Sequence, residues 1–261
     1  MEREKGVIIE EINMYEDMPN HQVQELWMRL LYGDTPAGWS IAGTKQNILA
    51  MKQEDFVNYH RKHYKEVIKE VKKIFGSMKR GHKGKKIKVR EAQSRPKALI
   101  NFKKTDQTHF VLGVRTYDLF DKRNAALSVL AGVLGGGMSS RLFVKLREEM
   151  GVGYYVRAGN DAYTDHGFFQ ISVGVDNKRI EEVLKAILEE CQKLKTAGVG
   201  EEELKKVKEF LIGNMKLSLE STDDIANFYG GQELLKRELK NAEDKAKEIR
   251  KVTAKEIQTL A

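Results

Sequence analysis

One segment of the chain cannot contribute to a hydrophobic core, and it divides the sequence into two regions. Positions 79–97 hold nine Lys or Arg residues against a single acid, Glu91, together with two glycines and one proline. The whole chain carries a formal net charge of +8, so the remainder is close to neutral. This composition is typical of a solvated linker, and contact with nucleic acid is the alternative.

The two regions differ in hydrophobic pattern. In the first, apolar residues recur at helical spacing, for example over 23–31, so that region is predicted to be mostly helical. In the second, strands are predicted at 98–102, 108–114, 153–158 and 168–175, and helices at 124–134, 141–150 and from 177 onward. The last two strands, joined by a turn-like stretch, are expected to be antiparallel. Strands followed by a block of helices indicate an α+β fold, with helices covering one face of a largely antiparallel sheet.

The composition excludes several classes of protein. With 261 residues, 41% of them hydrophobic, the chain is long enough to bury a core and is not disordered or fibrous. No apolar run approaches the ~20 residues of a membrane span. Cys191, the single cysteine, lies on the apolar stripe of a predicted helix, so a core position is favoured over a nucleophile. Since the first residues do not resemble a signal peptide, a reducing, cytoplasmic setting is expected.

Two patterns suggest ligand binding but have simpler interpretations. The glycines at 135–137 could approach a phosphate, yet they follow a helix and lack a Gly-Lys-Ser/Thr ending. A tight turn between helices, with Ser139 or Ser140 as the N-cap of the next helix, is favoured. His60 and His63 could share a metal, but no third ligand lies at helical spacing, so surface histidines are favoured.

A pair of acids near the start of the chain is more informative. Glu4 and Glu11 are seven residues apart, nearly two helical turns or ~10 Å of rise, which puts both carboxylates on one face of a helix. That geometry would let one carboxylate bind a metal directly while the other lies behind the ligands and supports them. Two charges on a solvated face are the alternative.

A second pair combines two hydrogen-bond donors. Arg147 and Tyr154 are also seven residues apart, but Gly151 and Gly153 between them should end the helix. The pair would then lie on either side of a helix-to-strand turn, where two donors can converge on one oxygen. A surface arginine and a half-buried tyrosine are the alternative.

At these residues the chain resembles the M16 zinc metallopeptidases, the insulinase and mitochondrial-processing-peptidase-like group with the inverted zinc motif HxxEH. Residues 4–12 (EKGVIIEEI) are similar to the segment that carries the family's third zinc ligand, and 38–44 (GWSIAGT) continues the similarity. Residues 134–143 (LGGGMSSRLF), with Arg147 and Tyr154, resemble the family's second half, which bears an Arg/Tyr pair. These stretches span nearly the whole chain.

The resemblance implies a division into three parts. Residues 1–78 are expected to be the C-terminal part of the zinc-bearing half, 79–97 a basic linker, and 98–261 the second M16-like half. Each half would be helices packed on a largely antiparallel sheet, with the first half incomplete. No HxxEH occurs among the six histidines, so the sequence is expected to be a fragment or a degenerate relative that lacks the first two zinc ligands and the general base.

The resemblance also implies what the candidate residues do. Glu11 would be the third zinc ligand and Glu4 its supporting acid, while Arg147 and Tyr154 would donate to the substrate carbonyl as it becomes an oxyanion. In the complete enzyme, Zn²⁺ lowers the pKa of its bound water to ~7 for attack on the peptide bond. A lone carboxylate is a poor ligand set, so this chain by itself is expected to bind zinc weakly and to hydrolyse no peptide.

Three functions compete at this point. The first is a portion of a zinc-dependent M16-type endopeptidase that acts on peptides or unfolded segments. The second is a non-catalytic M16-like protein for assembly or peptide holding, with a partner chain or as a homodimer. The third, a basic nucleic-acid-binding module, depends only on the charge of 79–97.

Overall fold

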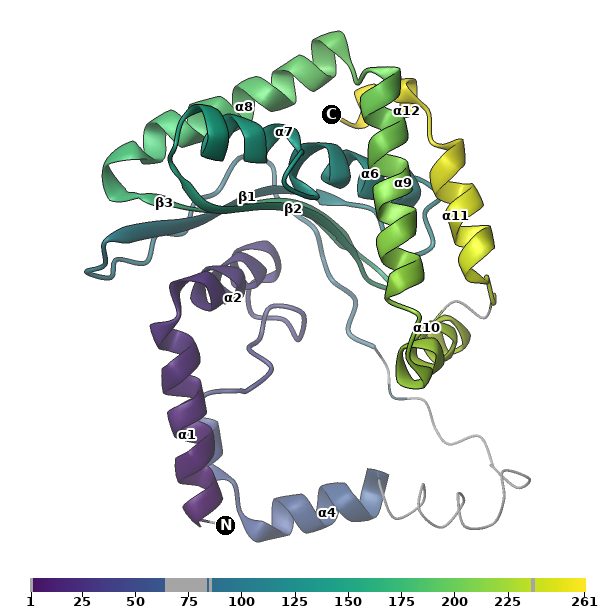
Figure 1. Ribbon diagram of the computed structural model, residues 1–261. Coiled ribbons are helices and arrows are strands. Elements are labelled where there is room, and N and C mark those ends of the chain that lie inside the picture. Colours follow the sequence, from purple (N-terminus) through teal and green to yellow (C-terminus); the bar gives the residue numbers. More distant parts are fainter. Residues whose placement is uncertain (1, 64–83, 85, 236–237) are drawn as a thin grey trace. The chain divides into compact units, whose positions relative to one another are not determined.

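The computed structural model describes residues 2–63, 84, 86–235 and 238–261. The chain forms two compact units, Met1–Leu99 and Ile100–Ala261, and each is described by itself (Figure 1). Assigning these units to a zinc-bearing half and a second half stays a prediction. Of the proposed linker, the described residues adopt no helix or strand and are mostly exposed, while 79–83 and 85 lie outside the described residues.

The first unit is helical in its described part. It contains α1 (Glu2–Asp17), α2 (Pro19–Tyr32), α3 (Lys45–Ala50) and α4 (Gln53–His63). Helix α1 contacts both α2 and α3. The apolar side chains at this junction are buried: Ile12, Trp27, Leu31, Tyr32 and Ile48. The described residues of this unit form no strand, so the sheet expected in an incomplete first half is not seen among them.

The second unit is built on a three-stranded antiparallel sheet. Its strands are β1 (Gln107–Thr116), β2 (Gly153–Ala162) and β3 (Gly167–Asp176), in the order β1-β3-β2. The helices are α6 (Asn124–Gly135), α7 (Arg141–Phe143), α8 (Ile180–Ala197), α9 (Glu201–Leu217), α10 (Thr222–Leu235), α11 (Ala242–Lys251) and α12 (Ala254–Leu260). Helices α6, α7 and α8 cover one face of the sheet (Figure 1). The α+β class and the antiparallel pairing of the two late strands are therefore confirmed.

The core of this unit lies between the sheet and the helices above it. Alternate residues of β3 point into it, and Val173 and Val175 are fully buried. They meet the apolar side of α6, where Val129 and Val133 are fully buried as well. Each such side chain contributes about 1.5–3 kcal/mol by leaving water, so this layer supplies much of the unit's stability.

Two sequence expectations are corrected here. Residues 98–102 form no strand, and Ile100 and Phe102 are 88% and 90% exposed. An apolar segment forms a strand only where a neighbouring strand pairs with it, and in the described sheet β1 pairs only with β3. The α-helix expected over 141–150 is instead α7 followed by a π-helix, Val144–Glu149, whose end is marked by a bond from the Met150 N–H to the Lys145 carbonyl.

The glycine turn after α6 is present, but its serine does not cap the next helix. Ser140 occupies the N-cap position of α7, yet its Oγ donates to the Gly137 carbonyl at 2.6 Å. The serine hydroxyl therefore closes the turn. Among the described residues, no helix is both long and apolar enough to cross a bilayer.

We expect Gly135→Ala to destabilise the second unit, because α6 ends directly against the backbone of β2. A Cβ at this position would lie 2.4 Å from the backbone nitrogen of Ala158, and backbone cannot yield as a side chain can. The overpacking should lower the free energy of unfolding by about 1–3 kcal/mol, measured by urea denaturation.

The matched control is Gly213→Ala, inside helix α9. A Cβ there meets nothing within 4 Å, so this variant should be as stable as the parent or about 0.5–1 kcal/mol more stable. Equal effects of the two substitutions would contradict the close approach.

Candidate functional site

Arg147 and Tyr154 lie next to each other at the join between the π-helix and β2. The Nη1 of Arg147 donates to the backbone carbonyl of Tyr154 at 3.2 Å. The guanidinium carbon also lies 5.5 Å from the centre of the Phe143 ring, one turn earlier. Both side chains are exposed, and Tyr154 is 53% exposed. The structure thus places the Arg147 guanidinium against the backbone of Tyr154, across the turn that the sequence predicted.

A single glycine makes the reversal between them possible. Gly151 has φ +64°, a conformation that side chains with a Cβ adopt only under strain. On either side of it, Leu146 and Val152 are buried in the core, and the Val152 N–H donates to the Leu146 carbonyl at 2.9 Å. The two anchors and the glycine fix the direction in which β2 leaves the helix.

A β-bulge accounts for the exposure of Tyr154. Gly153 lies opposite Val175 of β3, and Tyr155 lies opposite Gly174, so Tyr154 is an extra residue without a partner in the register. In a regular strand, position 154 would share the core face with Val156. Because of the bulge, Gly153 lies on the core face instead, and the tyrosine lies at the surface. Bulges are known to redirect side chains at functional sites in this way.

Arg141, which sequence reasoning did not single out, anchors the same region. Its guanidinium makes two bonds to the Glu203 carboxylate, Nε to Oε1 at 2.8 Å and Nη2 to Oε2 at 2.7 Å. Nη2 also donates to the Gly198 carbonyl. The hydrogen bonds to Glu203 raise the pKa of Arg141. Because its partners are 57 and 62 residues away, no local pattern could have identified this connection between α7 and the start of α9.

Glu4 and Glu11 lie on one helix, as the spacing predicted. Both belong to α1 and are exposed, while Ile12 beside them is buried. Lys5 of the same helix donates to the Leu49 carbonyl at 2.9 Å, which ties α1 to the end of α3. The helix therefore presents both carboxylates on its surface.

The described residues do not fit a complete zinc site. They contain no group of three or more His, Cys, Asp or Glu side chains arranged to hold a metal ion. A zinc site needs at least three protein ligands, and Glu11 offers one carboxylate. The side chains of His60 and His63, the other candidate ligands, lie outside the described residues.

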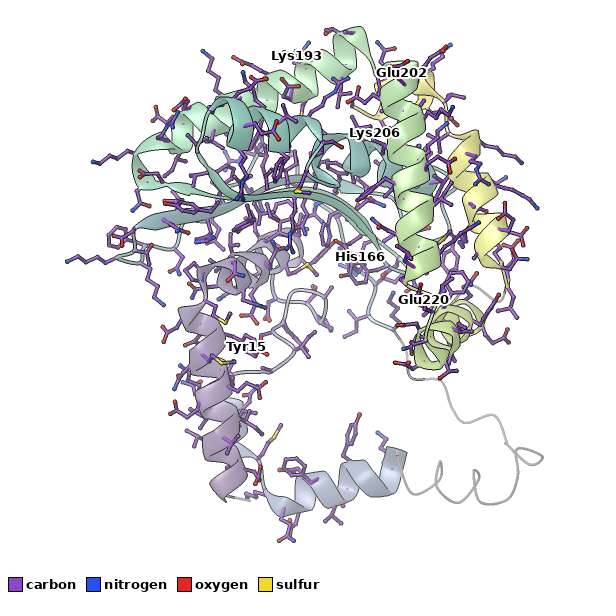
Figure 2. All side chains as sticks on the ribbon, in the orientation of Figure 1. Tyr15, His166, Lys193, Glu202, Lys206 and Glu220 are labelled. Carbon is purple, nitrogen blue, oxygen red and sulfur yellow. The ribbon has the colours of Figure 1, made fainter. Side chains whose placement is uncertain are left out.

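Two further features lie away from Arg147 and Tyr154. His166 occupies the turn at the far end of β2 (Figure 2), where its Nδ1 is 2.8 Å from Asp165 Oδ1 and its ring stacks on Tyr163. A cavity of 960 Å³ lies between the start of α6 and the helices α11 and α12. Neither Arg147 nor Tyr154 lines it, so this cavity is separate from the candidate donors.

An α+β unit that carries an adjoining arginine and tyrosine is typical of the peptidase-like fold expected from the sequence. A comparison with known families agrees, since the profile of the Peptidase M16 inactive domain matches residues 64–211. The chain belongs to the M16 peptidase family.

Individual known proteins are similar to this chain in sequence and in fold. The "Uncharacterized zinc protease YmxG" of Bacillus subtilis (strain 168) is 32% identical over 275 residues, which cover all of this chain and 67% of the relative. A crystal structure of a peptidase M16 inactive domain from Pseudomonas fluorescens has a TM-score of 0.80 at 20% identity, covering 99% of this chain and 66% of that one. A chain of complex III2 from Candida albicans has a TM-score of 0.80 at 11% identity, covering 99% of this chain and 67% of its own length. The two structures show the fold alone, and this chain spans about two thirds of each of these proteins.

We expect Gly151→Ala to disturb the reversal that joins Arg147 to Tyr154. A Cβ at φ +64° adds strain of about 1 kcal/mol, which should lower the free energy of unfolding by that amount in urea denaturation. Gly159→Ala, also in this region but with open space and no positive φ, is the control and should cause no such loss. Equal stability of the two variants would show that the turn tolerates a side chain.

Proposed function

We propose that this chain is part of an M16-type zinc endopeptidase that acts on peptides or unfolded segments. In this proposal Arg147 and Tyr154 donate to the substrate carbonyl, and Glu11 and Glu4 belong to the metal-binding part. The observation that carries the proposal is the hydrogen bond from Arg147 Nη1 to the Tyr154 carbonyl, which places the guanidinium beside the exposed bulge residue. The naming of relatives such as YmxG as zinc proteases supports it.

The two donors suit the carbonyl of an extended peptide. A guanidinium stays protonated and presents five N–H groups, and a phenol supplies one O–H donor. Hydrogen bonds aimed at an oxygen that gains negative charge stabilise the transition state more than the ground state. Arg147 uses Nη1 on a backbone carbonyl, which leaves its other nitrogens for a substrate oxygen.

The metal-binding part of the proposal needs other polypeptide. Glu11 would be the third ligand and Glu4 would support it, while the residues of HxxEH would come from outside these 261 residues. A partner chain, a second copy or a longer form of the same chain would each serve. We place the complete protein in the cytoplasm, consistent with the single cysteine of these 261 residues.

A second candidate is a non-catalytic M16-like protein that holds peptides or supports an assembly. The specific observation in its favour is that the matching family profile is described as the inactive domain. In this candidate the protein binds a peptide and a partner chain but does not hydrolyse the peptide. The two experiments below separate it from the endopeptidase.

We expect the purified chain alone to hold no tightly bound zinc and to cleave no unfolded peptide. One carboxylate cannot offset the loss of hydration of the ion. Zinc per chain is measured by elemental analysis after dialysis, and cleavage is followed with a fluorogenic unfolded peptide, with and without a chelator. Glu11→Gln is the control and should behave as the parent. One tightly held zinc per chain with chelator-sensitive cleavage would contradict this expectation.

Joined to polypeptide that carries HxxEH, the chain should be active, and Tyr154→Phe or Arg147→Ala should lower kcat by ~10²-fold. Each variant removes a donor and leaves the metal ligands in place, so the zinc content should not change. Tyr163→Phe, at the far end of β2, is the matched control and should keep kcat.

Two results would change the assignment. A loss of zinc in Tyr154→Phe or Arg147→Ala would show that the roles given to these residues are mistaken. A reconstituted complex that holds zinc and peptide but cleaves nothing would favour the peptide-holding protein.

A further inference from the structure

A histidine and a tyrosine from the two outer strands meet across the central strand of the sheet. His109 of β1 and Tyr155 of β2 are both opposite Gly174 of β3 in the register. Neighbouring strands are about 4.8 Å apart, so residues on the two outer strands are separated by roughly twice that distance. Only long side chains can bridge it, and only if the residue between them has no side chain.

Gly174 provides that space. A Cβ at this position would lie 2.6 Å from Cε1 of Tyr155 and 3.3 Å from Cε1 of His109. The two rings therefore close over the glycine, with centroids 5.6 Å apart and planes at 26°. The Nδ1 of His109 and the hydroxyl of Tyr155 are 3.1 Å apart, within hydrogen-bond distance. The contact lies on the sheet face opposite Val173 and Val175.

Both partners are uncharged at neutral pH. Burial lowers the pKa of His109. Burial also raises the pKa of Tyr155, an effect that the charge of Arg157 partly opposes. A neutral imidazole and a neutral phenol can each serve as donor or acceptor to the other, so the bond does not depend on a single tautomer.

The contact between His109 and Tyr155 lies directly beside the bulge residue Tyr154. Tyr155 is the residue at which pairing with β3 resumes after the bulge. On the other side of the bulge, Gly153 is in register with Val175, and Arg147 holds the Tyr154 carbonyl. The contact with His109 therefore adds a side-chain restraint, at the first residue beyond the bulge, to the backbone pairing of β2 with β3.

We propose that His109 is a positioning residue for Tyr154. By holding the hydroxyl of Tyr155 across β3, His109 fixes the far side of the bulge and so fixes the direction of the Tyr154 phenol. The catalytic consequence rests on the proposed function, whereas the positioning itself concerns this chain alone and is tested on it first.

The first experiment reports on Tyr154 directly. 3-Fluorotyrosine is introduced at position 154 of the full chain, and its ¹⁹F resonance is recorded. His109→Phe and Tyr155→Phe keep the rings but remove the polar contact, so the resonance should shift or broaden. His109→Asn places an amide near the position of Nδ1 and should restore the parent spectrum.

The matched control is Thr116→Val. It removes another bond between β1 and β2, from Thr116 Oγ1 to Asn160 Oδ1 at 3.2 Å, near the other end of the same strands. This variant should leave the resonance unchanged. An unchanged resonance in both His109→Phe and Tyr155→Phe, or an equal change in Thr116→Val, would overturn the proposal.

The second experiment uses the reconstituted protease. His109→Phe should lower kcat by about 10-fold or more with little change in KM, because a misplaced donor weakens only the transition state. In a Tyr154→Phe background the same substitution should have no further effect. A further loss of kcat in that background would overturn positioning through Tyr154. If Tyr154→Phe itself keeps full kcat, the proposed function fails, while the ¹⁹F result still decides the positioning.

Discussion

The reversal of the chain at Gly151, between two buried anchors, determines the geometry of the candidate site. Leu146 and Val152 enter the core from either side of the turn, and the positive φ of Gly151 lets the backbone join them. Since both anchors are held by packing, the residues near them have little freedom. Arg147 follows one anchor, and Tyr154 lies two residues beyond the other. The exposed donors thus take their positions from buried side chains.

The surrounding elements reinforce this turn at different points. The close approach of α6 at Gly135 fixes the middle of β2, because Ala158 lies directly beneath it. The bonds of Arg141 to Glu203 connect α7 with the start of α9. A rigid scaffold of this kind is what oriented donors require, since a displacement of about 1 Å can cost a large factor in rate.

Membership of the M16 family gives these features a context. The profile of the family's inactive domain matches residues 64–211, and the chain spans about two thirds of YmxG. The described residues do not complete a zinc site, so under the proposed function the remaining metal ligands would lie in other polypeptide. The proposed function and the proposed role of His109 can be tested separately for this reason.

The sequence by itself determined the features that depend on local pattern. Apolar spacing located α6 and the β2–β3 hairpin, and the Gly151 and Gly153 pair indicated that the helix ends between Arg147 and Tyr154. The spacing of Glu4 and Glu11 predicted their common helix face. These predictions succeeded because helical and strand periodicities are properties of neighbouring residues.

Only the tertiary structure decided the features that depend on distant residues. Residues 98–102 have the apolar composition of a strand but no partner among the described strands, and the bulge at Tyr154 exists only in register with β3. The contact of His109 with Tyr155 needs Gly174, which comes from a third strand. A linear pattern contains no information on which strand lies between two others, because strand order follows from the packing of the whole sheet.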